Sequence, residues 1–296
     1  MTPLALVLLT IPLAADAHEQ SNPLYRELRQ TGVTLNDKVR SPLPAPTLAD
    51  GLDAKAQKKV IDAVAGADYD PQELLRKSAT APFRFQVRDL EPPDSHSRAF
   101  AIDVWFIAHG DLPTITQKEF LEKLLESGNK EHKVQVLTEA ELAQRKLAAK
   151  ADGKYEERFT HAVFVLLNDV QLGATSHTVL TQTDESLLFA SRLDPRFTKD
   201  AEFPNQWRSL KKDEEGKTVL GPPHPYAGSG SYLKITRLKR EVSGRDDALF
   251  VEGHLVFVEP REWFASTNRL RSKLPTLIQD QVRSFRRELE KRSPRR

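Results

Sequence analysis

The stretch AFAIDVWFIAHGD, residues 99–111, decides the fold of this chain. It predicts a strand with apolar side chains on both faces, and such a strand lies inside a sheet. The segment His109-Gly110-Asp111 is typical of the turn that ends a strand. Asp103 is the exception, because a carboxylate inside an apolar strand needs a partner. The alternating sets are Phe100, Ile102, Val104 and Phe106 on one face, and Ala101, Trp105 and Ile107 on the other.

Other strands are indicated on both sides of this one, and the links between them are mostly too short for crossover helices. We therefore predict an α+β fold with a curved, mainly antiparallel sheet of six to eight strands. Its helices are expected on one side, with a long helix at the C-terminus. The strand segments are PFRFQVRDL (82–90), RFTHAVFVLLNDVQLG (158–173), TSHTVLTQT (175–183), LLFASRL (187–193), SYLKITRLKR (231–240) and ALFVEGHLVFVEP (248–260).

Helix signals accompany these strands. Asp50 is expected to cap the helix within LDAKAQKKVIDAVAG (52–66), and Thr138 with Glu141 predicts a capping box. The C-terminal helix is read from a stripe at helical spacing, and Pro275 is expected to kink or split it. The stripe consists of Leu270, Leu274, Leu277, Ile278, Val282, Phe285 and Leu289.

Composition excludes several kinds of site. The chain has 296 residues and no cysteine, so disulfides, thiolate metal sites and thiol nucleophiles are ruled out. A net charge of +2 gives no indication of nucleic-acid binding. A chain of this length can bury a sizeable core without covalent cross-links.

The N-terminus carries a targeting signal. An apolar run, residues 4–13, is followed by the small-x-small sequence Ala15-Asp16-Ala17, which is typical of a signal-peptidase site. We predict a signal peptide over 1–17 and a protein exported to the periplasm or the extracellular space. A short N-terminal anchor or a misassigned start are the alternatives. Residues 18–51 are expected to form an extended leader, and 52–296 a single domain with a long loop at about 198–231.

The sequence holds no phosphate-binding, zinc-protease or nucleophile-elbow motif. Asp103, His109, His161 and His254 are the candidates for catalysis, because two histidines and a carboxylate could assemble across neighbouring strands. The simpler interpretation is that backbone or solvent satisfies these strand-end histidines. We favour it, and expect neither a metal nor a cofactor.

The C-terminus is basic. RSFRRELEKRSPRR (283–296) holds seven basic and two acidic residues. Arg283, Arg286 and Arg287 are the candidates for contacting an anionic partner, and nucleic acid is disfavoured because no aromatic side chains alternate with them. The competing interpretation is a solvated helix end that complements the helix dipole.

Two resemblances follow from these segments. The opening NPLYRELRQTGVTL…PTLADGLD resembles secreted proteins of unknown function from planctomycete-type bacteria, which implies export. The last third has two strands, 231–238 and 248–260, followed by a long amphipathic helix with Pro275 near its middle. It resembles the end of a helix-grip domain, as in START-like lipid-binding and polyketide-cyclase-like proteins, in which the sheet encloses an apolar cavity around the last helix.

The leading functional hypothesis is a non-catalytic module that binds an apolar or amphipathic small molecule, or a component of the cell envelope. An exported hydrolase, with or without a metal, and a structural envelope protein are the alternatives. For the binding module we expect an apolar cavity, lined by Phe100, Trp105, Phe164, Phe257, Leu274 and Ile278.

Overall fold

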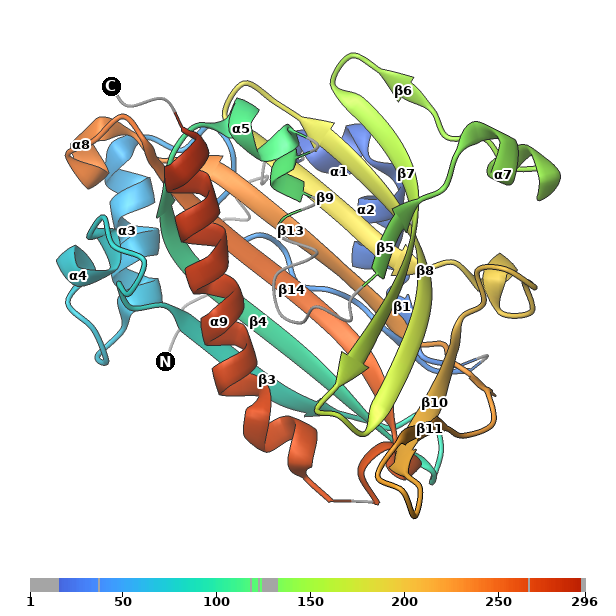
Figure 1. Ribbon diagram of the computed structural model, residues 1–296. Coiled ribbons are helices and arrows are strands. Elements are labelled where there is room, and N and C mark those ends of the chain that lie inside the picture. Colours follow the sequence, from blue (N-terminus) through green and yellow to red (C-terminus); the bar gives the residue numbers. More distant parts are fainter. Residues whose placement is uncertain are drawn as a thin grey trace, which may run out of the picture.

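The computed structural model describes residues 16–36, 38–117, 119–121, 123, 133–265 and 267–293. A single twelve-stranded sheet forms its centre, and all of its strand pairs are antiparallel (Figure 1). The main order is β11-β10-β8-β9-β13-β14-β4-β3, and β7 lies on β8 with β5 and β6 beside it. The strands are β3 (Arg84–Leu90), β4 (Ser97–His109), β5 (Lys133–Val136), β6 (Ala151–Asp152), β7 (Tyr155–Leu166), β8 (Val170–Gln182), β9 (Ser186–Leu193), β10 (Gln206–Lys212), β11 (Thr218–Leu220), β12 (His224–Pro225), β13 (Ser229–Arg237) and β14 (Ala248–Pro260).

The antiparallel α+β prediction is confirmed. Eight strands have seven or more residues, which agrees with the expected six to eight. The sequence missed five strands of this sheet: β10, which has seven residues, and β5, β6, β11 and β12, which have two to four. Three strands, β10 to β12, occupy the segment 198–231 that was expected to be a loop. The sheet is open rather than closed around the last helix, because the ends of the described strand order, β3 and β11, do not pair.

Strand β4 pairs with β14 along its whole length and with β3 on its other side. It is the second strand from an end of the order, not a central one. It is nevertheless buried on both faces, because helices cover the two faces of the sheet at this end. Ile107 packs with the helix at 54–65, and Phe106 with the C-terminal helix.

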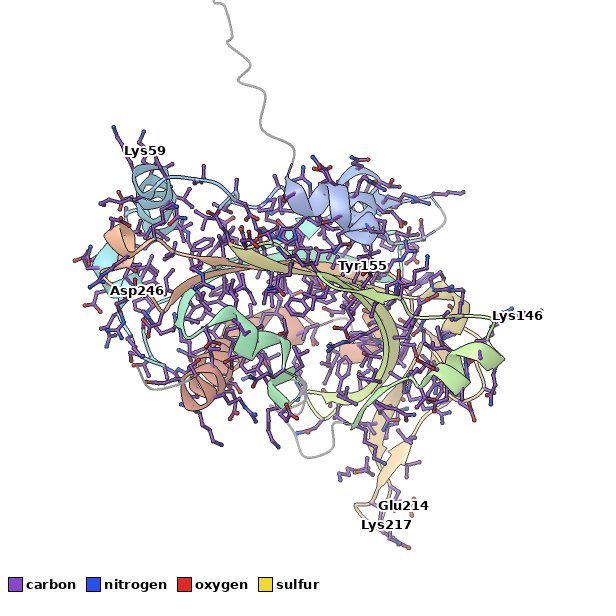
Figure 2. All side chains as sticks on the ribbon, turned by 90° about the horizontal axis from the view of Figure 1, so that it is seen from above. Lys59, Lys146, Tyr155, Glu214, Lys217 and Asp246 are labelled. Atoms are coloured by element: carbon purple, nitrogen blue, oxygen red, sulfur yellow. The ribbon has the colours of Figure 1, made fainter. Side chains whose placement is uncertain are left out.

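Helices therefore lie on both faces, and the prediction of one side was wrong. Figure 2 shows α1 (Ala17–Ser21), α2 (Pro23–Gln30) and α3 (Ala54–Ala65) on one side of the sheet, and α5 (Leu112–Thr116) and α9 (Arg269–Arg292) on the other. We call these sides the strap face and the α9 face. Inner strands carry buried apolar side chains on both faces, and each face needs a cover.

The described residues 16–36 and 38–50 form a segment that we call the strap. Helix α2 lies within the stretch expected to be an extended leader, and β1 (Val33–Thr34) pairs with β2 (Arg40–Ser41). The strap is part of the core. Its buried apolar side chains pack on strands β4, β8, β9, β13 and β14; they are Leu24, Tyr25, Leu28, Val33, Leu35 and Leu43.

Of the two helix caps predicted from the sequence, the structure has one. The capping box of Thr138 and Glu141 at α7 (Glu139–Gln144) is confirmed. Asp50 does not cap α3, because Asp53 does. Helix α9 continues through Pro275 without splitting. The remaining short helices are α4 (Pro71–Leu75), α8 (Arg240–Ser243), η1 (Pro195–Phe197) and η2 (Arg261–Phe264). Among the described helices, none is long and apolar enough to cross a membrane.

Candidate functional site

The partner of Asp103 is His254. The register of β4 and β14 places them opposite one another, and His254 Nδ1 lies 2.7 Å from Asp103 Oδ1. Arg88 on β3 donates to the other carboxylate oxygen from Nε and Nη2, at 3.2 and 3.1 Å. Burial opposes ionisation of Asp103, but the hydrogen bond and charge of His254, together with Arg88, outweigh it and lower the pKa of the carboxyl. Asp103 is thus a satisfied buried carboxylate.

His254 links Asp103 to a second carboxylate. Its Nε2 is 3.6 Å from Glu252 Oε2, and Glu252 accepts from the backbone N–H groups of Thr47 and Leu48 at 2.6 and 3.2 Å. Burial favours a neutral imidazole, but the two carboxylates outweigh it and raise the pKa of His254. His254 is 2% exposed and Glu252 0%. A substrate has no access to groups buried this deeply, so the cluster holds the strap in place.

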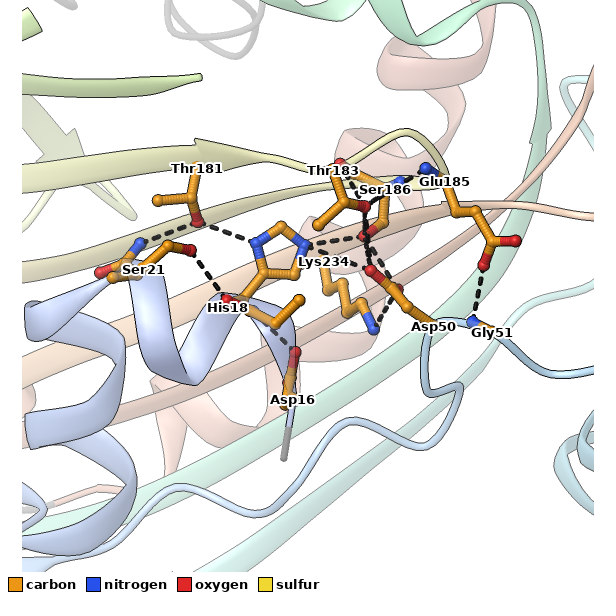
Figure 3. Close-up of polar contacts among 12 residues, drawn as sticks. Asp16, His18, Ser21, Asp50, Gly51, Thr181, Thr183, Glu185, Ser186 and Lys234 are labelled. Atoms are coloured by element: carbon orange, nitrogen blue, oxygen red, sulfur yellow. Dashed lines mark hydrogen bonds and ion pairs between the residues drawn. The ribbon is translucent and has the colours of Figure 1, made fainter. Parts of the chain in front are cut away.

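A second ion pair adjoins this cluster on the strap face (Figure 3). The fully buried Lys234 donates from Nζ to the carbonyl oxygen of Leu48 at 2.9 Å and lies 2.8 Å from Asp50 Oδ1. The hydroxyls of Ser186 and Thr183 donate to the same carboxylate. Burial raises the pKa of Asp50, but Lys234 and the hydroxyl donors outweigh it and lower that pKa. The charge of a buried lysine is therefore compensated by the strap itself.

His18 completes the network in Figure 3. Its Nδ1 is 2.8 Å from Thr181 Oγ1 and its Nε2 is 2.7 Å from Ser186 Oγ, so both ring nitrogens have hydroxyl partners. Burial and the nearby charge of Lys234 lower the pKa of His18 to about 4. The ring is consequently neutral at pH 7. His18 and Lys234 were not identified from the sequence as residues that join the strap to the sheet. A polar residue at a position that faces the interior is the signal that could have revealed them.

The four catalytic candidates do not converge. Asp103 and His254 meet, but His109 lies 3.4 Å from Asp247 Oδ1 and 3.2 Å from the carbonyl oxygen of Leu75. His161 is 2.8 Å from Thr175 Oγ1 at another position in the sheet. Burial lowers the pKa of His109 and of His161. Within the described ranges, no three His, Asp or Glu side chains are grouped so that they could hold a metal ion.

The basic candidates also separate. Arg286 is buried and donates to the carbonyl oxygens of Ile107 and Pro82 at 2.8 and 2.9 Å, which makes it unavailable to an anionic partner. Burial lowers its pKa to about 10. Arg283 is half-buried and Arg287 is exposed.

Five of the six apolar candidates gather on the α9 face. Trp105 is the exception, because it points to the strap face and donates from Nε1 to Thr47 Oγ1 at 2.9 Å. The other five belong to one apolar cluster beneath α9, in which the rings of Phe100 and Phe257 are 5.5 Å apart. They are Phe100, Phe164, Phe257, Leu274 and Ile278.

A group of five apolar side chains on the α9 face is only half-buried, although four of them lie on inner strands of the sheet and the fifth lies on α9. The strand register makes Leu233 the neighbour of Phe189 on one side and of Gly253 on the other. Figure 1 shows α9 crossing on the β4 side of these strands and α5 near one end. We call this group the α9-face patch; it consists of Val104, Phe189, Leu233, Leu255 and Ile278.

Gly253 forms the floor of the patch. It lies between Val104 and Leu233 in neighbouring strands, and its position on the α9 face carries no side chain. A Cβ atom added there would meet one side-chain atom, Leu233 Cδ1, at an ordinary contact distance of 3.4 Å. A glycine in a long inner strand often marks the close approach of another group to the backbone.

A polar row continues the patch toward β7. The register aligns Leu255, Ser231, Ser191, Thr178 and Arg158 across five strands, and all five are half-buried. Thr178 Oγ1 donates to Ser191 Oγ at 3.0 Å, and Arg158 pairs with the carboxylate of its strand neighbour at 156. The α9 face therefore presents apolar side chains beside α9 and hydroxyl groups beside β7.

Comparisons with known proteins give distant similarities in structure. No protein-family model matches the sequence, and no curated protein matches it. Human STARD10 is 6% identical, with 85% of this chain and 83% of that chain covered and a TM-score of 0.32. A conserved protein from Geobacillus kaustophilus is 8% identical, with 64% and 94% covered and a TM-score of 0.26.

Proposed function

We propose that this chain is an exported, non-catalytic binding module whose α9-face patch holds an amphipathic small molecule. The observation that carries the proposal is the partial exposure of four apolar side chains in the interior of the sheet, together with that of Ile278 on α9. Burial of apolar surface contributes about 25 cal/mol per Å² to the free energy of binding, so contact with the patch stabilises an apolar ligand. Export is supported by the sequence of residues 4–17.

The class of ligand follows from the two halves of the α9 face. An apolar body fits against Phe189, Leu233 and Leu255, and a polar end then reaches the hydroxyl groups of Ser191 and Thr178. Binding sites for small molecules commonly combine apolar walls with a few polar groups that fix orientation. An amphipathic molecule satisfies both halves.

A binding function is preferred to catalysis because of where the candidate acid–base groups lie. The Asp103–His254 pair is on the strap face, beneath Thr47 and Leu48, and the patch is on the opposite face. Groups separated from a ligand by the sheet itself cannot take part in proton transfer to it.

Filling the patch from its floor tests the proposal. The probe is 1-anilinonaphthalene-8-sulfonate, which has an apolar body and an anionic end. We expect saturable binding by the wild type and by Gly253→Ala, whose added Cβ has room. Gly253→Phe is expected to weaken binding at least about tenfold, since a ring would occupy the apolar surface that the probe needs.

Thermal unfolding of all three proteins is the control for folding. Equal probe affinity in folded Gly253→Phe and wild type would refute the patch as the site. Organic extraction of the purified protein, followed by mass spectrometry, then identifies the class of natural ligand. Recovery of an amphipathic compound from the wild type and not from Gly253→Phe is the expected result.

A further inference from the structure

Asp16 is built into the start of the strap. Its Oδ1 accepts from the backbone N–H of His18 at 3.0 Å, and its carbonyl oxygen accepts from the N–H groups of Glu19 and Gln20 at 2.8 and 3.3 Å. Asp16 is thus the N-cap of α1. The residue lies inside the stretch 1–17 that the sequence assigns to the signal peptide.

Asp16 also satisfies a core tyrosine. Tyr25 is fully buried, and its hydroxyl donates to Asp16 Oδ2 at 3.1 Å. Burial and the negative charge of Asp16 raise the pKa of Tyr25, so the hydroxyl keeps its proton and uses this acceptor. The Tyr25 ring packs edge-on against Tyr232 of β13, at 5.1 Å between centroids. Loss of Asp16 would leave a buried hydroxyl without this partner.

The sequence admits two positions for the cut. The small-x-small sequence Ala15-Asp16-Ala17 precedes a cut after Ala17. A cut after Ala15 also follows a small residue, but it has Leu13 in place of the first small residue of that pattern. A cut after Ala17 removes the cap of α1 and the acceptor of Tyr25. It also removes the carbonyl of Ala17, which accepts from Ser21 Oγ at 2.9 Å. A cut after Ala15 keeps all of these contacts.

We infer that processing occurs between Ala15 and Asp16, so that Asp16 is the first residue of the mature protein. The inference rests on the proposed export. Hydrolysis of the Ala15–Asp16 peptide bond consumes one water molecule, leaves a carboxylate on Ala15 and frees the α-amino group of Asp16. Because cleavage of a signal peptide precedes folding, its position decides whether Asp16 is present when the strap docks.

Electrostatics favours the same position. A cut after Ala17 would create an α-ammonium group on His18, the residue whose imidazole already has its pKa lowered by burial and by Lys234. The new ammonium group would add to the repulsion that the His18 imidazole already experiences from Lys234. The same cut would remove the carboxylate of Asp16, whose negative charge raises the pKa of His18. A cut after Ala15 places the ammonium group on Asp16, two residues before His18 and on the same residue as a carboxylate.

The N-terminus of the processed protein tests the inference. The full 296-residue chain is expressed in a bacterial host, the periplasmic and cytoplasmic fractions are separated, and the intact mass and N-terminal peptide are measured. Asp16 as the first residue is the expected result. A protein that begins at His18 overturns the cleavage position and leaves export standing, whereas an uncleaved cytoplasmic protein overturns both.

A stability comparison distinguishes the two cuts independently. Asp16→Ala in the full chain lowers the Tm of the processed protein by several degrees if Asp16 is retained, and has no effect if it is removed. Glu19→Ala is the matched control, because Glu19 accepts from exposed Gln30, whereas the acceptor of the Tyr25 hydroxyl is Asp16. Equal Tm values for the wild type and Asp16→Ala would overturn the inference.

Discussion

His18 makes the fold sensitive to acid, and its contribution can be worked out from the structure. The imidazole is fully buried, and its pKa of about 4 lies below the ordinary value of 6.5. A histidine with a depressed pKa contributes stability that is present above pH 6.5 and is lost as the pH falls through 4. The full difference corresponds to about 3 kcal/mol, and the part lost between about pH 7.5 and about pH 4.5 is roughly 2.5 kcal/mol.

The variant His18→Gln isolates this contribution. Its amide can still bond a hydroxyl at the Nε2 position, where Ser186 lies, but it does not titrate. Urea unfolding at the two pH values gives a free energy of unfolding for each protein. We expect the loss on acidification to be roughly 2 kcal/mol larger in the wild type than in the variant. Losses that agree within about 0.5 kcal/mol would refute the reasoning, since they would mean that His18 takes up its proton equally in both states.

Three further outcomes are expected. His254 has a raised pKa, so its stabilisation is complete below pH 6.5 and is lost as the pH rises through the folded-state pKa; unfolding of His254→Gln should lack this alkaline decline. Arg286→Met should lower the free energy of unfolding in urea by about 3 kcal/mol, because backbone carbonyls lose a buried donor. The exposed control Arg287→Met should change it by less than about 0.5 kcal/mol. Gly228→Ala should lower the Tm, because φ is +87° and the new Cβ would lie 2.5 Å from Val258 Cγ2; an unchanged Tm would contradict that geometry.

The alternation of apolar residues predicted the sheet well. Residues 99–109 form β4 because their two faces are apolar, and the short links between strands correctly indicated antiparallel pairing. The same alternation could not show which elements cover each face, because that depends on contacts between distant segments. The strap was therefore read as an extended surface segment, although Tyr25 and its neighbours enter the core.

The site was harder to predict than the fold. Asp103 was identified as needing a partner, and His254 was among the candidates, but only the register of β4 and β14 joins them. Trp105 was placed with the apolar lining, although the alternation within residues 99–107 already puts it on the opposite face from Phe100. Gly253 could not be identified from the sequence. The effect of a glycine on a binding surface depends on which side chains surround it, and these come from neighbouring strands.

The contacts of the strap constrain the order in which the chain can fold. Thr47 binds a carboxylate 205 residues further along the sequence, and His18 a hydroxyl 168 residues away. During synthesis the first segment to leave the ribosome is therefore without its binding surface until β14 has been made. Contacts of such high sequence separation form slowly. We therefore expect docking of the strap onto the sheet to be a late step of folding.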